Sequence, residues 1–226
     1  MEIVEYKGFE IKIESDNHPS NPRTDWDNGT VMVCQHNRYS LGDEKHGVDL
    51  SDCNSWEDVK QAIIDQKNPI AILPLFLYDH FGITMNTTGF SCNFDSGKVG
   101  FIFVDEKGCE EMGWSKEWAE GLSKGDDEKY KGKTREEILT NFMISDVEIY
   151  DNYLTGEVYG FDIDDVDDGS CSGFFGDDHE ESGLLDHARS AIDCELRYKV
   201  KKRVEAIKYY IRGKVPFIYR TLPEIV

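Results

Sequence analysis

The feature that most constrains the fold of this chain is a long apolar row near its C-terminal end. Between about residues 182 and 213, apolar side chains recur every three or four positions, from Leu184 through Val204 to Ile211. That spacing is typical of one face of an α-helix. Gly213 stands where a helix of this kind would end. The pattern therefore predicts one long helix over 182–213.

The N-terminal part of the chain shows strand patterns instead. Residues 9–14 alternate apolar and charged side chains, which is the period of a half-buried strand. Because the turn pair Lys7-Gly8 precedes them, residues 2–6 and 9–14 are expected to form a hairpin. Further strands are expected at 30–35, 69–78, 83–85, 99–104 and 158–163.

Two more helices are marked by their first residues. Thr134 and Glu137 have the spacing of a capping box, in which each side chain bonds a free backbone N–H of the other, and an apolar row then runs to Gly156. Ser55 is a candidate N-cap for a shorter helix that runs to about Gln66.

The length of 226 residues allows one large domain or two small ones. The chain has no internal repeat, no low-complexity linker and no break rich in Pro, Gly or Ser. We therefore predict an α+β fold with residues 1–226 as a single domain. Its mixed or antiparallel sheet would be packed by the mid-chain helix and by the long C-terminal helix.

The charge of the chain is large and unevenly spread. With 25 Lys and Arg against 45 Asp and Glu, the net charge is −20. Residues 195–226 carry nine basic and three acidic side chains, a net charge of +6, so residues 1–194 carry −26. This balance argues against nucleic-acid or anionic-membrane binding by the surface as a whole. A local nucleic-acid site on the basic C-terminal helix stays open.

The most acidic stretch, residues 161–187, has ten Asp or Glu and no Lys or Arg. Such a surface complements a basic one, and complementary charge speeds association and makes it depend on salt. We therefore predict that this stretch binds a partner protein with a basic surface. The predicted partner-binding carboxylates are Asp162, Asp164, Asp165, Asp167, Asp168, Asp177, Asp178, Glu180 and Glu181.

The same stretch has a second interpretation, an irregular Ca²⁺ or Mg²⁺ site whose ligands would be Asp164, Asp165, Asp167 and Asp168. An EF-hand is excluded. With Gly169 at the sixth position of that loop, Val166 and Phe175 occupy positions that need oxygen ligands. A solvated acidic loop is the preferred interpretation, so no cofactor is predicted, and Ca²⁺ or Mg²⁺ stays the alternative.

The favoured interpretation is a protein without catalytic activity, and the alternative is an enzyme. Asp79 and His80 end the most apolar predicted strand, and Cys92 and Asp95 follow close by in a polar loop, where catalytic groups are often placed. These four residues could serve a metal-assisted hydrolase or a nucleotide-processing enzyme.

A further pair of candidate residues stands earlier in the chain. Cys34 and His36 stand two residues apart on a predicted strand, so they would face the same side and could bind a metal or pair as thiolate and imidazole.

The location expected from the sequence is the cytoplasm. No apolar run approaches the roughly 18 residues of a membrane-spanning helix. The start, Met-Glu-Ile-Val-Glu-Tyr, lacks the basic and apolar segments of a signal peptide. The six cysteines include no C-x-x-C pair, so reduced thiols are expected.

Several sequence blocks together resemble an uncharacterised family of bacteriophage proteins. The resemblance covers roughly residues 16–176, and this chain departs from the family at Asn28-Gly29, where the family more often has a Leu between the two. It implies a phage or prophage origin and action inside a bacterial cell. The blocks include Asn21-Pro-Arg23, Asp25-Trp-Asp-Asn-Gly-Thr30, Met32-Val-Cys34, Arg38-Tyr-Ser-Leu-Gly-Asp43, Leu73-Pro-Leu-Phe-Leu-Tyr-Asp-His80, Asp95-Ser-Gly97, Val99-Gly-Phe-Ile102, Tyr153-Leu-Thr-Gly156 and Val158-Tyr-Gly160.

Charge and resemblance together suggest a hypothesis for the function. An acidic accessory protein of a phage would bind a host protein and inhibit or modulate it. A basic surface that handles nucleic acid is the matching target, as in the defence enzymes of restriction or CRISPR systems, and the carboxylates would then act as a DNA mimic.

Overall fold

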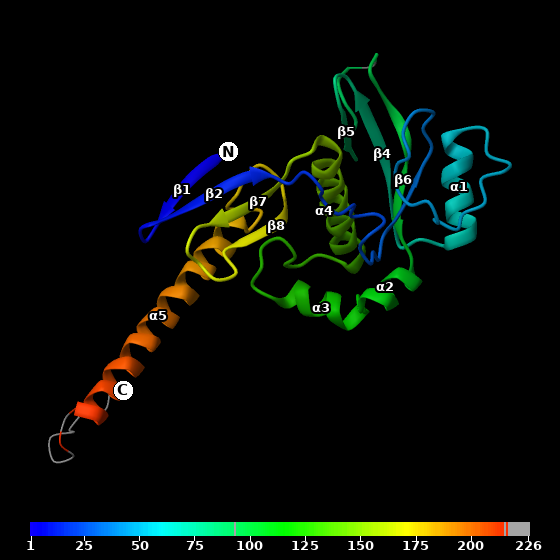
Figure 1. Cartoon of the computed structure of the whole chain (residues 1–226). Helices are drawn as coiled ribbons and strands as arrows, with labels where there is room; N and C mark the ends of the chain where they lie inside the picture. The colour runs from blue at the N-terminus through cyan, green and yellow to red at the C-terminus, as the bar shows by residue number, and fades with distance from the viewer. Residues whose placement is uncertain (93, 215, 217–226) are drawn as a thin grey trace. The chain divides into compact units, whose positions relative to one another are not determined.

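The strands of the protein form two antiparallel sheets of four strands each (Figure 1). A computed structural model describes residues 1–92, 94–214 and 216. One sheet belongs to a compact unit of residues 1–17 and 158–226, here called the terminal unit, and the other to residues 18–157, the central unit. The predicted α+β class is confirmed, as are the antiparallel strands, the mid-chain helix and the long C-terminal helix. That residues 1–226 act as a single domain stays a prediction.

The terminal unit has the strand order β1-β2-β7-β8. Its elements are β1 (Glu2–Tyr6), β2 (Phe9–Ser15), β7 (Val158–Ile163), β8 (Ser170–Phe175) and α5 (Leu184–Lys214). As the alternation predicts, Ile11 and Ile13 are buried on β2. They pack with the first turns of α5, whose buried residues are Leu184, Leu185, Ala188 and Ile192.

The central unit has the strand order β3-β6-β4-β5 and helices on both faces of its sheet. Its elements are β3 (Val31–Cys34), α1 (Trp56–Lys67), β4 (Ala71–Asp79), β5 (Ile83–Asn86), β6 (Ser96–Val104), α2 (Glu106–Met112), α3 (Lys116–Lys124) and α4 (Arg135–Thr155). Alternate residues of β6 divide between two clusters: Ile102 packs with α4, and Phe103 packs with α1. The sheet is therefore the middle layer of three.

The predicted end signals of α4 are present in the structure. The Thr134 hydroxyl accepts a hydrogen bond from the Glu137 backbone N–H, and the Glu137 carboxylate accepts one from the Thr134 backbone N–H. Gly156 ends the helix in the left-handed conformation. Pro74, which has no backbone N–H to donate, precedes a register shift between Leu75 and Phe76 in the pairing of β4 with β6.

The long C-terminal helix is also confirmed. It was expected over 182–213, and α5 runs from Leu184 to Lys214, 31 residues. No helix within the described ranges is both long enough and apolar enough to cross a membrane.

Candidate functional site

The nine predicted partner-binding carboxylates lie at the two ends of β8. Five of them, here called the hairpin group, lie on the last residues of β7 and in the turn before β8: Asp162, Asp164, Asp165, Asp167 and Asp168. Four, here called the loop group, lie between β8 and α5: Asp177, Asp178, Glu180 and Glu181. A strand of six residues, roughly 16 Å long, separates the two groups. The structure thus divides the predicted set into two surfaces.

The hairpin group presents its carboxylates to solvent, because all five residues are exposed. Asp165 and Asp168 adopt the left-handed conformation, with φ of 61° and 55°, which aspartate tolerates better than most residues. Asp164 accepts a hydrogen bond from the Lys12 ammonium at 2.6 Å, the one ion pair of the group among the described residues. The backbone therefore uses these aspartates to build the turn and leaves most of their charge uncompensated.

The loop group is partly used inside the terminal unit. The Asp178 carboxylate accepts hydrogen bonds from the backbone N–H groups of Glu180 and Glu181, at 2.9 and 3.0 Å, and these bonds lower its pKa. Glu180 binds both terminal nitrogens of Arg189 at 2.6 and 2.8 Å, and this contact lowers the pKa of Glu180. These contacts hold the chain at the start of α5. Only Asp177 and Glu181 keep carboxylates outside these contacts.

The metal interpretation of the hairpin group has no matching geometry in the described residues. No group of three or more His, Cys, Asp or Glu side chains there is placed so that it could hold a metal ion. Asp164, Asp165, Asp167 and Asp168 therefore do not converge on a common point. A Ca²⁺ or Mg²⁺ site at these residues stays the untested alternative to a solvated acidic loop.

The alternative catalytic residues are brought together in part, at the end of β4. The Asp79 backbone N–H donates a hydrogen bond to the Asp95 carbonyl at 2.8 Å. His80 Nδ1 lies 3.3 Å from the Asp95 carboxylate, with both side chains about half exposed. A His–Asp pair of this kind orients an imidazole for proton transfer. The Cys92 carbonyl accepts a hydrogen bond from the Ser96 hydroxyl, and among the described residues no hydrogen bond or ion pair joins the Cys92 thiol to the His80–Asp95 pair.

The Asp79 carboxylate is engaged with neighbours on the loop after β3. It accepts hydrogen bonds from Arg38 Nη1 at 3.1 Å and from the Tyr39 hydroxyl at 3.2 Å. Its negative charge is therefore paired with a guanidinium, and Asp79 contacts the His80–Asp95 pair through its backbone N–H. A catalytic role for Asp79, His80, Cys92 and Asp95 stays the untested alternative to a protein without catalysis.

Cys34 and His36 do not form the predicted pair. Strand β3 ends at Cys34, so the two side chains are not held on one strand face. His36 Nδ1 instead accepts hydrogen bonds from the backbone N–H groups of Arg38 and Tyr39, and its ring stacks on Tyr39 with centroids 5.1 Å apart. Burial raises the pKa of the Cys34 thiol to about 12, so this thiol is protonated at neutral pH.

The thiols are therefore expected to differ widely in reactivity. Cys171 and Cys194 are exposed, whereas Cys109 is buried. Since only the thiolate reacts, a pKa of about 12 in place of the ordinary 9.0 slows Cys34 by about a thousandfold. In the native protein at pH 8, a disulfide reagent should modify Cys171 and Cys194 first, and Cys34 and Cys109 only after unfolding. Mass spectrometry of the modified peptides measures this order, and rapid native labelling of Cys34 would contradict it.

A buried arginine network in the central unit was not predicted from the sequence. The Arg23 side chain is 1% exposed and binds both oxygens of the Asp43 carboxylate, at 2.9 and 2.7 Å. It also donates to the Thr30 carbonyl at 2.8 Å, and the Thr30 hydroxyl donates to the Asp146 carboxylate on α4 at 2.6 Å. Burial raises the pKa of Asp146, and the nearby Arg23 opposes that rise. The network ties the loop before β3 to the loop after it and to α4.

This network forms one wall of a surface cleft of about 390 Å³ that Trp26 and Lys45 also line. All of the guanidinium nitrogens of Arg23 already have partners in the network, so the side chain has little capacity left for a ligand. In the sequence, Arg23, Thr30 and Asp43 each fall in a different one of the blocks that carry the resemblance to phage proteins, and that resemblance stays a prediction.

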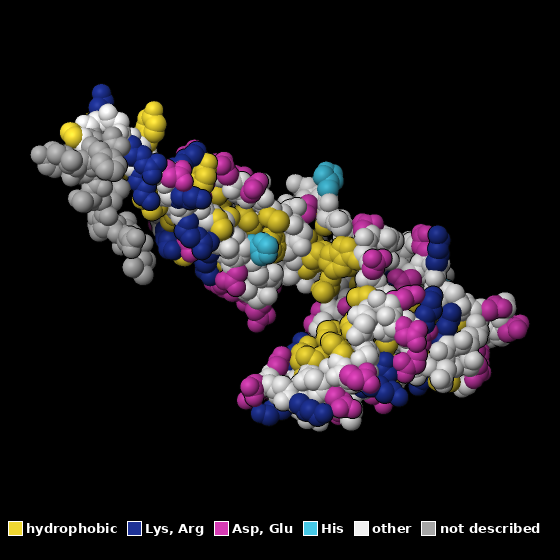
Figure 2. Space-filling model, turned by 90° about the horizontal axis from the view of Figure 1, so that it is seen from below, with side chains coloured by type: hydrophobic (Ala, Val, Ile, Leu, Met, Phe, Trp, Pro, Cys, Tyr) yellow, Lys and Arg dark blue, Asp and Glu magenta, His cyan; other side chains and the backbone are white. Residues whose placement is uncertain are grey.

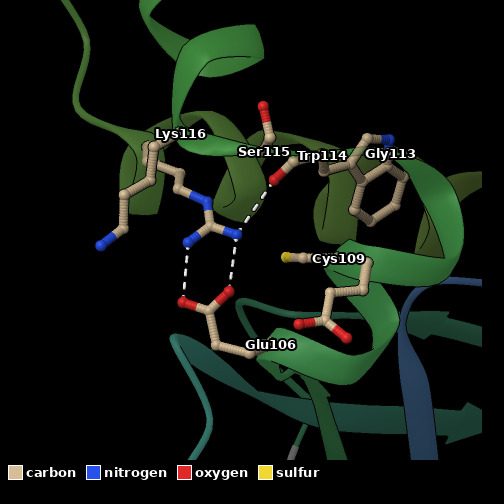
Figure 3. Close-up of a pocket in the computed structure, with 8 residues that line it drawn as sticks. Glu106, Cys109, Gly113, Trp114, Ser115 and Lys116 are labelled. Atoms are coloured by element: carbon tan, nitrogen blue, oxygen red, sulfur yellow. Dashed lines mark hydrogen bonds and ion pairs between the residues drawn. The ribbon is translucent and has the colours of Figure 1, made fainter.

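A second pocket, of about 300 Å³, lies between α2 and the start of α4 (Figure 3). Arg135 binds both oxygens of Glu106, at 2.8 and 2.9 Å, and donates to the Trp114 carbonyl at 3.0 Å. The Cys109 side chain faces the same guanidinium (Figure 3), and burial raises the pKa of its thiol. The ion pair joins two helices, and the raised pKa keeps the Cys109 thiol protonated at neutral pH.

Of these arrangements, the hairpin group presents the most uncompensated charge, and the His80–Asp95 pair has the clearest capacity for proton transfer. The Arg23 and Arg135 clusters are ion pairs that hold elements together. Comparison of the chain with family models, with curated proteins and with solved structures finds no match.

Proposed function

We propose that the protein is a phage accessory protein that acts inside a bacterial cell by binding a host protein. Its target would be a nucleic-acid-handling defence enzyme, of the restriction or CRISPR kind, whose basic surface the hairpin group contacts. The observation that carries the proposal is the set of five exposed carboxylates on one turn of a chain with a net charge of −20. Closely spaced negative charge is what a surface that binds the DNA backbone recognises.

The described contacts support binding at the hairpin group more than at the loop group. Four exposed carboxylates of the hairpin group form no ion pair with any described residue: Asp162, Asp165, Asp167 and Asp168. In the loop group, by contrast, Glu180 pairs with Arg189 and Asp178 binds backbone N–H groups. Because the four hairpin carboxylates have no ion pair to break among the described residues, a basic partner can pair with them directly, and complementary charge speeds its association. The partner contact is therefore expected to centre on the β7–β8 turn.

The proposal predicts loss of function on neutralising the turn. Asp165→Asn, Asp167→Asn and Asp168→Asn together remove three negative charges and keep the left-handed conformations, which asparagine also tolerates. Expressed in bacteria that carry a restriction or CRISPR system, the wild-type protein should raise the plating efficiency of a targeted phage. The triple variant should lose most of that effect. The enzyme captured by the wild type should be released by high salt and by duplex DNA.

The matched control removes the same charge elsewhere. Asp126→Asn, Glu128→Gln and Glu148→Gln neutralise three exposed carboxylates of the central unit, and this variant should protect the phage as the wild type does. Equal loss in both variants would assign the effect to net charge alone. Full protection by the Asp165, Asp167 and Asp168 variant, or a captured enzyme that duplex DNA does not displace, would refute binding through the hairpin group.

A further inference from the structure

The C-terminal half of α5, residues Arg197–Lys214, here called distal α5, carries an apolar row in which Val200 and Ile207 are exposed and Val204 and Ile211 are half-buried. The buried residues of α5 end at Ile192. Beyond them the helix extends past the strands of its unit (Figure 1), and Val200 and Ile207 are 60% and 56% exposed. Exposed β-branched residues at regular spacing are unusual on a solvated helix, since they favour strands and buried positions.

The spacing of this row is that of a coiled-coil seam. Val200, Val204, Ile207 and Ile211 are separated by four, three and four residues, the a/d spacing of a heptad. With Val204 and Ile211 at a, the row is a narrow stripe, whereas helices that lie on a membrane bury a wide apolar face. A seam of this width fits one further helix.

Three of the four residues that flank the seam are basic. In the register that places Val204 at a, Lys201 and Lys208 occupy e positions and Arg203 a g position, and the other g position holds Tyr210. The one acid of distal α5, Glu205, lies at b, away from the seam. Lys and Arg side chains gather around hydrophobic ones at this end of the terminal unit (Figure 2). A second copy of the chain would place like charges across the seam in either orientation, which is unfavourable.

We propose that distal α5 docks an acidic amphipathic helix of a partner protein, one with apolar residues at a and d and with Asp or Glu at e and g. The contacts of the basic residues inside the terminal unit leave the seam available. The Lys199 ammonium binds Glu195 at 3.1 Å and the Asp165 carbonyl at 3.3 Å, and the Lys202 ammonium lies 4.5 Å from the Tyr198 ring. None of these is an a, d, e or g position of the central heptad. This surface is separate from the hairpin group. The hairpin group is proposed to bind a basic partner, whereas distal α5 binds an acidic one.

Duplex DNA would use the basic residues but would not account for the apolar row, and an anionic membrane would need a wider apolar face than this row provides. Phosphate contacts need Lys and Arg alone, and salt governs their strength. A helix partner uses both features, because the seam is buried while the e and g charges pair. The row and the charges together therefore favour an acidic helix.

The test uses a synthetic three-heptad peptide with Ile at a, Leu at d and Glu at e and g, labelled with a fluorophore. Its fluorescence anisotropy should rise on titration with the full-length protein, and the affinity should fall as salt is raised. Val204→Gln with Ile207→Gln should weaken binding at least about tenfold. The matched control, Ala206→Gln with Tyr209→Gln, changes the outer face and should bind as the wild type does.

A charge exchange separates the seam from general electrostatics. Lys201→Glu, Arg203→Glu and Lys208→Glu together should reverse the preference, so that a peptide with Lys at e and g binds better than the Glu peptide. Parallel titrations use duplex DNA and vesicles that contain phosphatidylserine. Absence of Glu-peptide binding to the wild type overturns the proposal. So does a seam variant that keeps its peptide affinity but loses DNA or vesicle binding.

Discussion

Replacing Arg23 by alanine is expected to lower the free energy of unfolding of the central unit by about 3–5 kcal/mol. The guanidinium is 1% exposed and compensates the carboxylates of Asp43 and Asp146. Without it, Asp43, whose side chain is 16% exposed, keeps its charge without a cation. The loss is a large part of the 5–15 kcal/mol that stabilises a typical domain. Urea unfolding measures it as a lower midpoint.

The loss from Arg23→Ala should depend on pH. Burial raises the pKa of Asp146 and Arg23 lowers it, so the variant raises that pKa further. A carboxyl group with a raised pKa in the folded state destabilises the fold when it must ionise, and the penalty disappears when it is protonated in both states. The part of the difference that comes from Asp146 should therefore be full at neutral pH, shrink as the pH falls through the raised pKa of Asp146, and be absent once the carboxyl is protonated in both proteins.

The chain offers a sharp probe and a matched control for this experiment. All four tryptophans lie between residues 18 and 157, so their fluorescence follows the central unit. Arg38 also pairs with an aspartate, Asp79, at 3.1 Å, but its side chain is 71% exposed. Arg38→Ala should cost less than about 1 kcal/mol. If Arg23→Ala and Arg38→Ala lower the free energy of unfolding equally, burial does not determine how much the Arg23 network stabilises the central unit.

Elements that depend on neighbouring residues could be predicted from the sequence. The capping box at Thr134 and the alternation on β2 each involve contacts within a few positions, and both are present. The apolar row of α5 could be recognised from its period alone. Helix α2 could not, because seven residues are too few to show a period. Strand β8 was also missed, since its Ser, Cys and Gly residues do not alternate and its extended form comes from pairing with β7.

The candidate sites were harder to predict because they depend on distance in space. The acidic residues of 161–187 form one stretch in the sequence, and only the position of β8 divides them into two groups. Arg23, Asp43 and Asp146 are far apart along the chain, and an arginine is ordinarily taken as a surface residue. The sequence could show that distal α5 has an apolar face. It could not show that the sheet covers only the first half of α5.

Gly108→Ala is expected to lower the free energy of unfolding of the central unit by about 1–3 kcal/mol. A Cβ at this position of α2 would overlap the carbonyl oxygen of Gly29, which is backbone and cannot rotate away. Gly29 is equally confined, because a Cβ there would meet Met112 Cγ at 2.5 Å and the Trp114 ring at 2.7 Å. The turn before β3 and helix α2 therefore approach each other at the two glycines, and a methyl group must push them apart.

Gly121→Ala is the matched control, with an effect of the opposite sign. Gly121 lies inside α3 and is exposed, and an added Cβ would meet no atom within 4 Å. Alanine should therefore stabilise the helix by up to about 1 kcal/mol, because it loses less backbone freedom on folding than glycine does. Tryptophan fluorescence in urea should show the midpoint falling for Gly108→Ala and rising for Gly121→Ala. If both substitutions raise it, helix propensity alone governs these positions, and the close approach of α2 to Gly29 does not constrain the fold.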